Sequence, residues 1–395
     1  MFEKQRAQKE YAALVDIGSG SVTISIVYSN HKEDKTEVVW TYHERLLLKH
    51  ADKTRGRRPL LSNLMQCFLS LGSEGLQHLR EFDAQAHINL LQVGISAPWS
   101  YTVTKTVDLN NDSPILINKI LLNEVRQIAE EKIQNEINEN EVASSLDLAV
   151  VSRCVTQLRA NDYILEDIEQ HNATSLSFTL SSVIIQKYLY QALVEARDKV
   201  LPNAQLQITS TMLQLYFALR DTLPQIREYC LVNVTLEATE IAVVRNGVFT
   251  YSTHEPCGVI DIAKEISDVA NIPLAEVYAR IQKIKAHLNQ NDEIPESAAI
   301  MQAYQMRIAS LLKQTGDDFT IPKSIYMHCT GCAYDFILPY IEGAAESATN
   351  FSHIVHIIPE QLAIPWRSTA SNTCIEEISA LFFHRYGHDT RFTHF

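Results

Sequence analysis

The sequence YAALVDIGSGSVTISIVY, residues 11–28, decides the fold of this chain. Two runs rich in Val and Ile flank the short sequence GSGS at 18–21, which is the pattern of two strands joined by a tight turn of small residues. A third strand is expected over 37–43, a helix over 60–82 and a buried strand over 88–96. The chain is therefore expected to open with a β-meander and to continue with alternating helix and strand.

A small α+β unit is expected next, inserted in the first half of the chain. Residues 101–109, YTVTKTVDL, alternate as a strand does, and residues 115–137 carry the apolar stripe of a long amphipathic helix. The other predicted elements are strands over 146–158 and 175–185, a helix over 187–201, and a strand and helix over 206–219. The last two elements return the chain to the α/β pattern.

The second half repeats the opening theme. Residues 229–253, YCLVNVTLEATEIAVVRNGVFTYST, predict a strand, a short turn and a strand, with Asn246 and Gly247 turning into a third strand. The remaining predicted elements are helices over 259–313, a strand, loop and helix over 324–342, and a helix over 374–386. An internal repeat of this kind predicts two similar halves.

The composition limits the partners. Acidic side chains outnumber basic ones by 47 to 34, so the formal net charge is −13 in 395 residues. This excess opposes binding to a phosphate backbone, and no nucleic-acid partner is expected. The N-terminal sequence lacks the apolar core of a secretory signal, no stretch has the apolar length of a membrane span, and seven scattered cysteines suit reduced thiols. We therefore expect a cytoplasmic protein without direct membrane insertion.

The GSGS turn is a candidate phosphate-binding loop. Backbone N–H groups in such a turn form a concave nest and the Ser hydroxyls add donors, so a terminal phosphate can be held there. Asp16 lies just before the turn, where a carboxylate can bind the water shell of a Mg²⁺ ion bridging the phosphates. In the alternative interpretation, Gly18 and Gly20 serve only to form the turn.

Residues 15–27, VDIGSGSVTISIV, resemble the first phosphate loop of the actin, Hsp70 and sugar-kinase superfamily, and the order of elements is similar to FtsA and PilM in particular. Residues 90–109 and the helix after them resemble the start of the subdomain that FtsA and PilM insert at this point. The resemblance covers nearly the whole chain. It implies an α/β, actin-like fold of two duplicated RNase H-like lobes, with a small α+β subdomain inserted in the first half.

The resemblance also implies boundaries and binding residues. The expected parts are the first lobe at 8–92 and 182–226, the insert at 93–181, and the second lobe at 227–262 and 323–395 with a helical insertion at 263–322. The implied cofactors are ATP and Mg²⁺, with Asp16 as the metal ligand. The implied nucleotide-binding residues come from two phosphate loops, a loop before a helix and an adenosine loop: Asp16, Gly18, Ser19, Gly20, Ser21, Thr239, Gly258, Thr330 and Gly331.

The second phosphate loop departs from the family pattern. It reads NVTLEATEIAVV, with Asn233 in place of the aspartate. Thr235, Leu236 and Glu237 stand in the glycine positions, and only Thr239 is roughly retained. Bulk and negative charge at these positions oppose phosphate binding, and an amide cannot take a proton as a carboxylate base can. No catalytic residue is therefore assigned. We expect nucleotide binding to be weak or lost, and no efficient ATPase activity.

Three further patterns have two interpretations each. Cys329 and Cys332 form a CxxC that could bind zinc or do redox chemistry, although a zinc site needs a second ligand pair and the adenosine loop already explains these positions. Glu276 and Arg280 contact a nucleotide, or form an i,i+4 ion pair on a surface helix. The last predicted helix packs on a core or lies on a membrane surface with its apolar stripe of Ile375, Ile378, Leu381 and Phe382.

The function that these observations favour is a scaffold. We expect a PilM-like cytoplasmic platform protein of type IV pilus assembly, peripheral at the inner membrane, which grips the cytosolic tail of an inner-membrane protein. The first alternative is an FtsA-like division protein that polymerises, so self-association is a further expectation. The second alternative is an active ATPase or phosphotransferase of the same fold.

Overall fold

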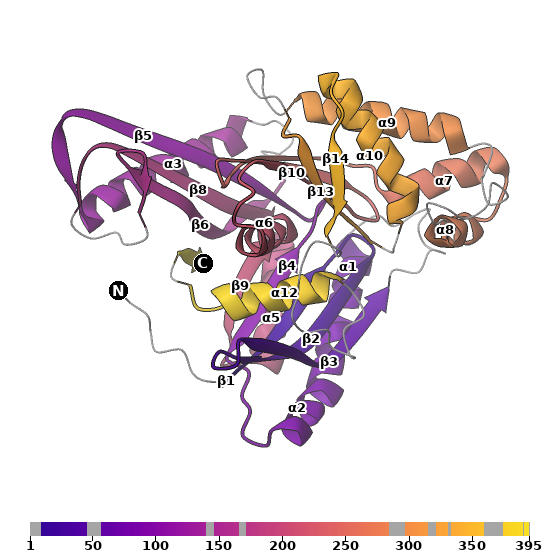
Figure 1. Ribbon diagram of the computed structural model, residues 1–395. Coiled ribbons are helices and arrows are strands. Elements are labelled where there is room, and N and C mark those ends of the chain that lie inside the picture. The colour runs from indigo at the N-terminus through magenta and orange to yellow at the C-terminus, as the bar shows by residue number, and fades with distance from the viewer. Residues whose placement is uncertain are drawn as a thin grey trace.

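A computed structural model describes residues 9–45, 57–139, 146–165, 171–283, 297–314, 321–330, 333–358, 374–389 and 391–394. The described chain forms three five-stranded β-sheets with helices packed around them. Two sheets belong to the two lobes, and the third belongs to an insert that projects to one side of the molecule (Figure 1). The two lobes lie on either side of helices α6 and α12.

The sheet of the first lobe is a β-meander extended by two parallel strands. The pairing of β1 with β2 is antiparallel, and β4 and β9 continue the sheet in parallel with β1. In spatial order the strands are β3 (Lys35–Arg45), β2 (Ser21–Asn30), β1 (Lys9–Ile17), β4 (Leu90–Ile95) and β9 (Gln205–Ser210). These strands occupy the places that the sequence predicted.

Alternation along β1 assigns its side chains to two faces. Val15 and Ile17 pack in the core that also holds residues of α1 (Arg57–Ser70) and α5 (Lys187–Val200). Leu14 packs on the opposite face, where Ala380 and Phe383 of α12 lie. Asp16 has the same parity as Leu14 and therefore faces α12.

The helix predicted over 60–82 is interrupted. After α1 the chain forms a π-helical turn, η2 (Leu71–Gly75), and then α2 (Leu76–Phe82). A Cβ on Gly75 would lie 2.9 Å from the ring of Trp40, so the glycine allows this turn to approach β3 closely.

The sheet of the second lobe repeats the strand order of the first. The strands are β12 (Val248–Glu255), β11 (Thr239–Arg245), β10 (Tyr229–Val234), β13 (Ser324–Cys329) and β14 (Ile354–Ile357). The helices that pack with this lobe are α7 (Val259–Ala270), α8 (Leu274–Lys283), α9 (Ser297–Lys313) and α10 (Tyr334–Thr349). The duplication that the sequence predicted is therefore confirmed.

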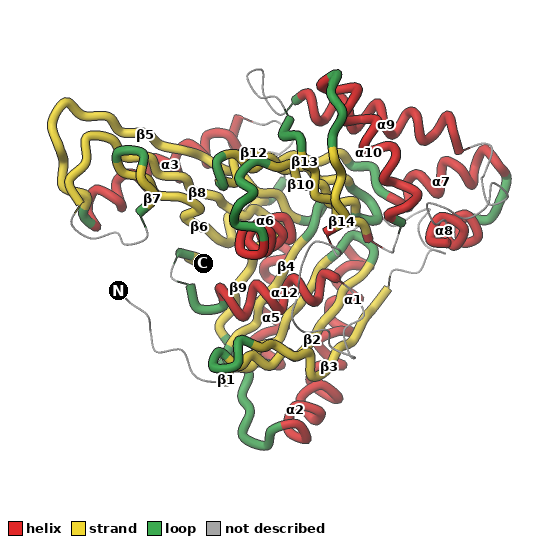
Figure 2. The backbone as a smooth tube through the Cα atoms, viewed as in Figure 1, coloured by secondary structure: helices red, strands yellow, loops and turns green. Residues whose placement is uncertain are grey.

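The insert is an antiparallel sheet with one long helix. Its strands are β5 (Ser100–Ile117), β8 (His171–Gln186), β6 (Leu148–Ala160), the short β7 (Tyr163–Ile164) and β15 (Phe392–His394). The helix α3 (Lys119–Glu139) buries Val125, Ala129, Ile133 and Ile137 against this sheet. With 18 and 16 residues, β5 and β8 are the longest strands that the structure describes (Figure 2). The helix predicted to begin at residue 115 begins at Lys119, because β5 resumes pairing with β8 after a register shift between Asn110 and Ile115 and ends at Ile117.

Residues 323–395 were expected in the second lobe, and the last helix of this range also contacts the first lobe. Helix α12 (Cys374–Tyr386) lies on the first lobe, near α6 (Thr211–Thr222). Gln92 Nε2 donates to Ser379 O at 2.9 Å, and Ser379 Oγ donates to Gln214 Oε1 at 2.9 Å. The apolar stripe of α12 belongs to a core cluster that holds residues of both sheets, so the helix packs between the lobes.

That stripe is buried in the protein. Ile378, Leu381 and Phe382 are at most 8% exposed, which favours the core interpretation of this helix over a membrane-surface one. The side chain of Ile375 lies outside the described set. Among the helices that the structure describes, none combines the length and apolar character needed to cross a bilayer.

Candidate functional site

The first phosphate loop is a tight hairpin turn. Asp16 pairs with Thr23 and Ile17 with Val22, and Gly18 N donates to Ser21 O at 3.0 Å to close the turn. Neither glycine of the turn has a positive φ angle. The backbone of the turn therefore does not require glycine, and another cause has to explain these two residues.

The second loop has the same geometry with different residues. Asn233 pairs with Glu240 and Val234 with Thr239, and Thr235 N donates to Ala238 O at 2.8 Å. Residues 235–238 therefore correspond in register to residues 18–21, with Asn233 in the place of Asp16. In this register Thr235 and Glu237 take the places of Gly18 and Gly20, whereas Leu236 takes the place of Ser19.

The two loops touch each other. A Cβ built on Gly20 would lie 2.1 Å from Leu236 Cδ2, so the Leu236 side chain fills the space that a side chain at position 20 would need. Glu237 N donates to Ser19 Oγ at 2.9 Å and links the same two turns by a hydrogen bond. Leu236 is only 7% exposed. Gly20 thus permits close contact between the lobes.

Gly258 also permits a close approach, at the N-terminus of α7. A Cβ there would lie 2.5 Å from the backbone carbonyls of Thr235 and Leu236. The first amides of α7 bind these carbonyls: Val259 N donates to Thr235 O at 3.1 Å and Ile260 N to Leu236 O at 2.9 Å. Because helix N-termini hold anions through such amides, this helix has already used the donors that a phosphate would take.

The loop between β4 and β5 contacts both turns. Trp99 Nε1 donates to Gly18 O at 3.2 Å, and Thr235 Oγ1 is 3.3 Å from Ala97 O. The sequence had not singled out this loop. The first turn, the second turn and this loop therefore each contact the other two.

Asp16 faces the helix between the lobes. Its Oδ1 is inaccessible to solvent and has no hydrogen-bond partner in the described part of the chain. Burial raises the pKa of Asp16 to about 7, and the charge of Glu376 on α12 acts in the same direction. Glu376 Oε1 accepts from Ser25 Oγ at 3.2 Å and from Thr41 Oγ1 at 2.5 Å. The neighbourhood therefore disfavours a free carboxylate at Asp16.

Asn233, the equivalent of Asp16 in the second lobe, lies in a row of buried polar side chains with His328 and Glu240. His328 Nδ1 lies 2.8 Å from Asn233 Oδ1, and burial lowers the pKa of His328 to about 4. Glu240 is 2% exposed, and burial raises its pKa to about 8, opposed by the Ala97 amide and Asn233. Glu240 was not predicted as a site residue, although a glutamate in an otherwise apolar strand was the available signal.

Thr239 does not face the turns. Its Oγ1 donates to Cys257 O at 2.8 Å and lies 2.9 Å from Tyr304 Oη, in the core of the second lobe. Thr330 follows the end of β13, and Gly331 lies outside the described residues, so the adenosine loop stays a prediction. Ser21 lies at the start of β2, and its carbonyl closes the first turn.

The remaining candidate sites are the pair Glu276 and Arg280 and the pair Cys329 and Cys332. Arg280 Nη2 donates to Glu276 Oε1 at 2.5 Å, which is the i,i+4 ion pair of an exposed helix surface. Cys329 is buried and unoxidised, and Cys332 is not among the described residues. Within the part of the chain that is described, no group of three or more His, Cys, Asp or Glu side chains is arranged to hold a metal ion.

Comparison with known proteins gives the fold a name. No family model matches this sequence, and neither does any curated protein. A chain of a PilM–PilN type IV pilus biogenesis complex is similar over 97% of this chain and 97% of its own, with 12% identity and a TM-score of 0.57. The fold is therefore actin-like, as the sequence predicted.

Two other solved structures are similar at a lower level. The ethanolamine utilization protein EutJ from Carboxydothermus hydrogenoformans has 11% identity over 94% of this chain and 89% of its own, with a TM-score of 0.44. A Bacteroides thetaiotaomicron protein with an actin-like ATPase fold and unknown function has 12% identity over 96% and 98%, with a TM-score of 0.45.

Proposed function

We propose that this chain is a non-enzymatic scaffold of actin-like fold, in which direct contact between the two lobes replaces a bound nucleotide. One observation carries the proposal: Leu236 of the second turn occupies the space beside Gly20 of the first. In a nucleotide-binding member of such a fold, phosphates would lie between these turns. Here the turns hold each other.

The residues at the turns do not fit the phosphates of ATP. A phosphate at the first turn would have to displace Leu236 from Gly20 and break the hydrogen bond from Glu237 N to Ser19 Oγ. A phosphate at α7 would compete with the carbonyls of Thr235 and Leu236 for the helix amides. The Glu237 side chain adds a negative charge to this loop, which opposes an anion further.

The metal and proton-transfer roles also lack suitable groups. Asp16 faces Glu376, and its pKa is raised, so a divalent cation would have to offset both burial and the neighbouring acid. Asn233 stands where the family has a carboxylate, and its amide oxygen lies against His328. Efficient hydrolysis of ATP is therefore not part of the proposed function.

The proposed partner is the cytosolic tail of an inner-membrane protein. The support is the likeness in fold, over nearly the full length of both chains, to a chain of the PilM–PilN complex. On this basis we place the protein on the cytoplasmic side of the inner membrane, as a platform component of type IV pilus assembly. The contact between the two turns links the lobes directly, as this scaffold role requires.

A nucleotide titration tests the first half of the proposal. A ligand at one hundred times its Kd would add about 2.7 kcal/mol to the free energy of unfolding, so millimolar Mg-ATP should raise the unfolding temperature measurably if it binds. We expect no change. An ATPase rate that Asp16→Ala abolishes would contradict the proposal.

A capture experiment tests the second half. Synthetic peptides covering the cytosolic N-terminal tails of single-span inner-membrane pilus proteins are titrated against the full chain by fluorescence anisotropy. We expect one tail to bind at a 1:1 ratio, with the same affinity with and without Mg-ATP. Binding that requires ATP, or sedimenting filaments in place of tail binding, would overturn the scaffold role.

A further inference from the structure

The last turn of α12 packs a histidine against the end of β2 and the turn that follows it. The side chain of His384 is 2% exposed, with Nδ1 2.7 Å from Ser29 Oγ and Nε2 2.8 Å from Asp34 Oδ1. Because an ionised carboxylate can only accept, Nε2 carries the ring proton, and Nδ1 of the neutral ring accepts from the Ser29 hydroxyl. The neutral imidazole therefore satisfies both of its nitrogens.

A second imidazole lies on the face of the first. The rings of His31 and His384 are stacked, with centroids 4.8 Å apart and planes inclined by 16°. His31 Nε2 and His388 Nε2 both donate to Glu10 Oε2, at 3.0 and 3.2 Å. An imidazole ordinarily becomes charged near pH 6.5. A proton on His31 therefore places a positive charge directly on the ring of His384.

The charges around His384 mostly disfavour a proton on it. Burial lowers the pKa of His384, and the charges of His31 and Arg385 act in the same direction, whereas the hydrogen bond and charge of Asp34 raise it. Arg385 Nη2 lies 3.2 Å from Asp34 Oδ2, so this carboxylate is shared between two side chains of α12. The other charged side chains in and next to this turn are exposed: Lys32, Glu33 and Lys35. The docked end of α12 thus favours the neutral ring.

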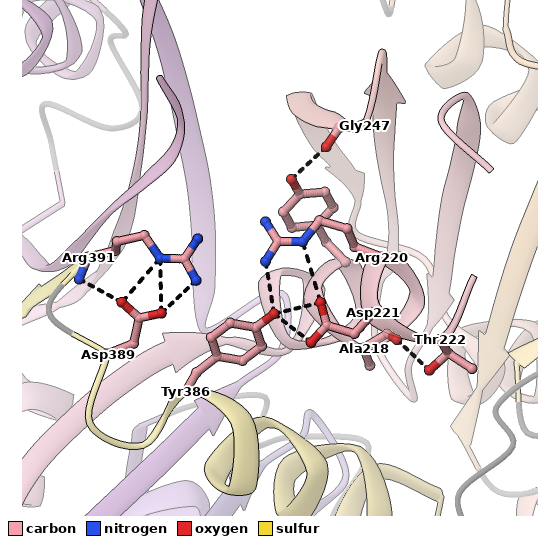
Figure 3. A network of polar contacts seen from close by, with 9 residues as sticks. Ala218, Arg220, Asp221, Thr222, Gly247, Tyr386, Asp389 and Arg391 are labelled. Carbon is pink, nitrogen blue, oxygen red and sulfur yellow. Dashed lines mark hydrogen bonds and ion pairs between the residues drawn. The ribbon is translucent and has the colours of Figure 1, made fainter. Parts of the chain in front are cut away.

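The chain beyond this turn crosses to the insert. We define the strap as the described residues between 387 and 394. At its start, Tyr386 Oη donates to the Asp221 carboxylate at 2.6 and 2.7 Å, as Figure 3 shows. At its end, Phe392 pairs with Cys154 of β6, and its ring centroid lies 6.1 Å from that of Tyr386. The last turn of α12 therefore fixes where the strap begins.

We propose that the stacked rings of His31 and His384 form a pH-sensitive latch at the end of α12, which holds the strap on the insert near neutral pH and releases it as the pH falls. A proton on His384 Nδ1 takes away the acceptor of the Ser29 hydroxyl, which is fully buried and has no water to replace it. Two charged rings face to face also repel each other. Release of the turn brings both rings into water and removes both costs. The latch does not depend on the function proposed above.

The direction of the pH dependence follows from linkage. The pKa of His384 is lower in the docked turn than its ordinary value of 6.5, so docking is fully favoured above pH 6.5 and weakens as the pH falls below it. Glu10 acts only at lower pH. Burial raises the pKa of Glu10, but hydrogen bonds from His388 and His31 lower it to about 2, so its contribution is lost below its ordinary pKa of 4.5. The range from pH 5.5 to 7.5 therefore separates His384 from Glu10.

The test measures hydrogen exchange of the full chain at pH 5.5 and 7.5, corrected for intrinsic exchange rates. We expect protection of residues 382–388 and of the strap to be about fivefold lower at pH 5.5, since one group with an ordinary pKa of 6.5 shifts an equilibrium by at most roughly tenfold over this range. In His384→Gln the protection should differ by less than about twofold between the two pH values. The matched control is His171→Gln, which replaces an exposed histidine at the start of β8 and should keep the fivefold response.

Three results would overturn the proposal. They are equal protection of the last turn at both pH values, a pH response that persists in His384→Gln, and a strap that stays protected while the last turn of α12 loses protection. If His384→Gln does not fold, a titration of the histidine ¹³Cε1 resonances in the unmodified chain decides. The resonance that Asp34→Asn moves to lower pH belongs to His384, because this carboxylate stabilises the charged ring. Its midpoint should lie below pH 6.5, and a midpoint at or above that value contradicts the latch.

Discussion

The two hairpin turns of this molecule share a backbone and differ in what their side chains do. Gly18 N binds Ser21 O at 3.0 Å in the first lobe, and Thr235 N binds Ala238 O at 2.8 Å in the second. The first turn consists of small residues only, whereas the second carries Leu236 into the first. A duplicated fold can thus keep the geometry of its hairpins while the residues at their turns make different contacts.

The buried polar side chains beside the two turns also differ between the lobes. In the first lobe a carboxylate, Asp16, lies opposite Thr23, whereas in the second an amide, Asn233, lies opposite the carboxylate of Glu240. The carboxylate of the second lobe thus lies on β11, the equivalent of β2, and not on β10, the equivalent of β1. Burial at this position raises the pKa of Glu240.

The strongest way to break this comparison is to add a methyl group at Gly258. Its Cβ would lie 2.5 Å from backbone atoms of Thr235 and Leu236, which cannot rotate away as a side chain can. We expect Gly258→Ala to lower the free energy of unfolding by about 3 kcal/mol, at the upper end of overpacking effects. Urea denaturation measures the change. Gly72→Ala, where the nearest atom is a Val200 methyl at 3.5 Å, is the control and should have little effect.

A smaller effect is expected within the first turn, where the two glycines should not behave alike. Gly20→Ala places a Cβ 2.1 Å from Leu236 Cδ2 and should cost about 1–2 kcal/mol, because this side chain can shift in part. Gly18→Ala meets nothing closer than 3.5 Å and should stay within about 0.5 kcal/mol of the unmodified chain. Equal costs at both positions would show that Leu236 is not the reason for Gly20.

The smallest expected effect is a pH dependence of the free energy of unfolding, which distinguishes Glu240 from His328. The pKa of Glu240 is about 8 in the folded chain against 4.5 when exposed, so the folded state keeps a proton that the unfolded state has lost. Stability should therefore fall as pH rises between these values. His328, with its pKa lowered from 6.5 to about 4, changes stability only below pH 6.5. The window from pH 6.5 to 8 isolates Glu240 from His328.

Across that window the unmodified chain should lose roughly 1–2 kcal/mol, since one pH unit corresponds to about 1.4 kcal/mol per group. Glu240→Gln should remove most of this loss. Asp16→Asn is the comparison: the pKa of Asp16 is raised from 3.8 to about 7, so this variant should alter the slope mainly below pH 7. Urea denaturation at three pH values checks both, and parallel curves for Glu240→Gln and the unmodified chain would refute the assignment.

Much of the fold was predictable because its elements are locally encoded. The alternation around GSGS placed β1 and β2, and the repeat at 229–253 placed the second hairpin with Asn233 in the register of Asp16. The end of β5 was missed because residues 115–117 continue the apolar pattern of the helix after them. The contacts of helix α12 with the first lobe could not be predicted, because an apolar stripe does not say which sheet it covers.

The site was harder to predict, because its meaning depends on distances between lobes. The sequence identified Leu236 as a bulky residue where the family has glycine, but it did not predict that this side chain packs against Gly20. Thr239 was carried over as a phosphate contact, whereas its hydroxyl is bound inside the second lobe. Glu240 and His328 gained their roles from strand pairing across β11, β10 and β13, which no local pattern encodes.

A double-mutant cycle between Gly20 and Leu236 tests the central claim most directly. Leu236→Ala alone should cost about 2–4 kcal/mol as a buried leucine, and it also empties the space that a methyl group on residue 20 needs. The account predicts that Gly20→Ala costs almost nothing in the Leu236→Ala background, a coupling of about 1 kcal/mol or more in the free energy of unfolding. Additivity within about 0.4 kcal/mol would contradict the contact between the turns.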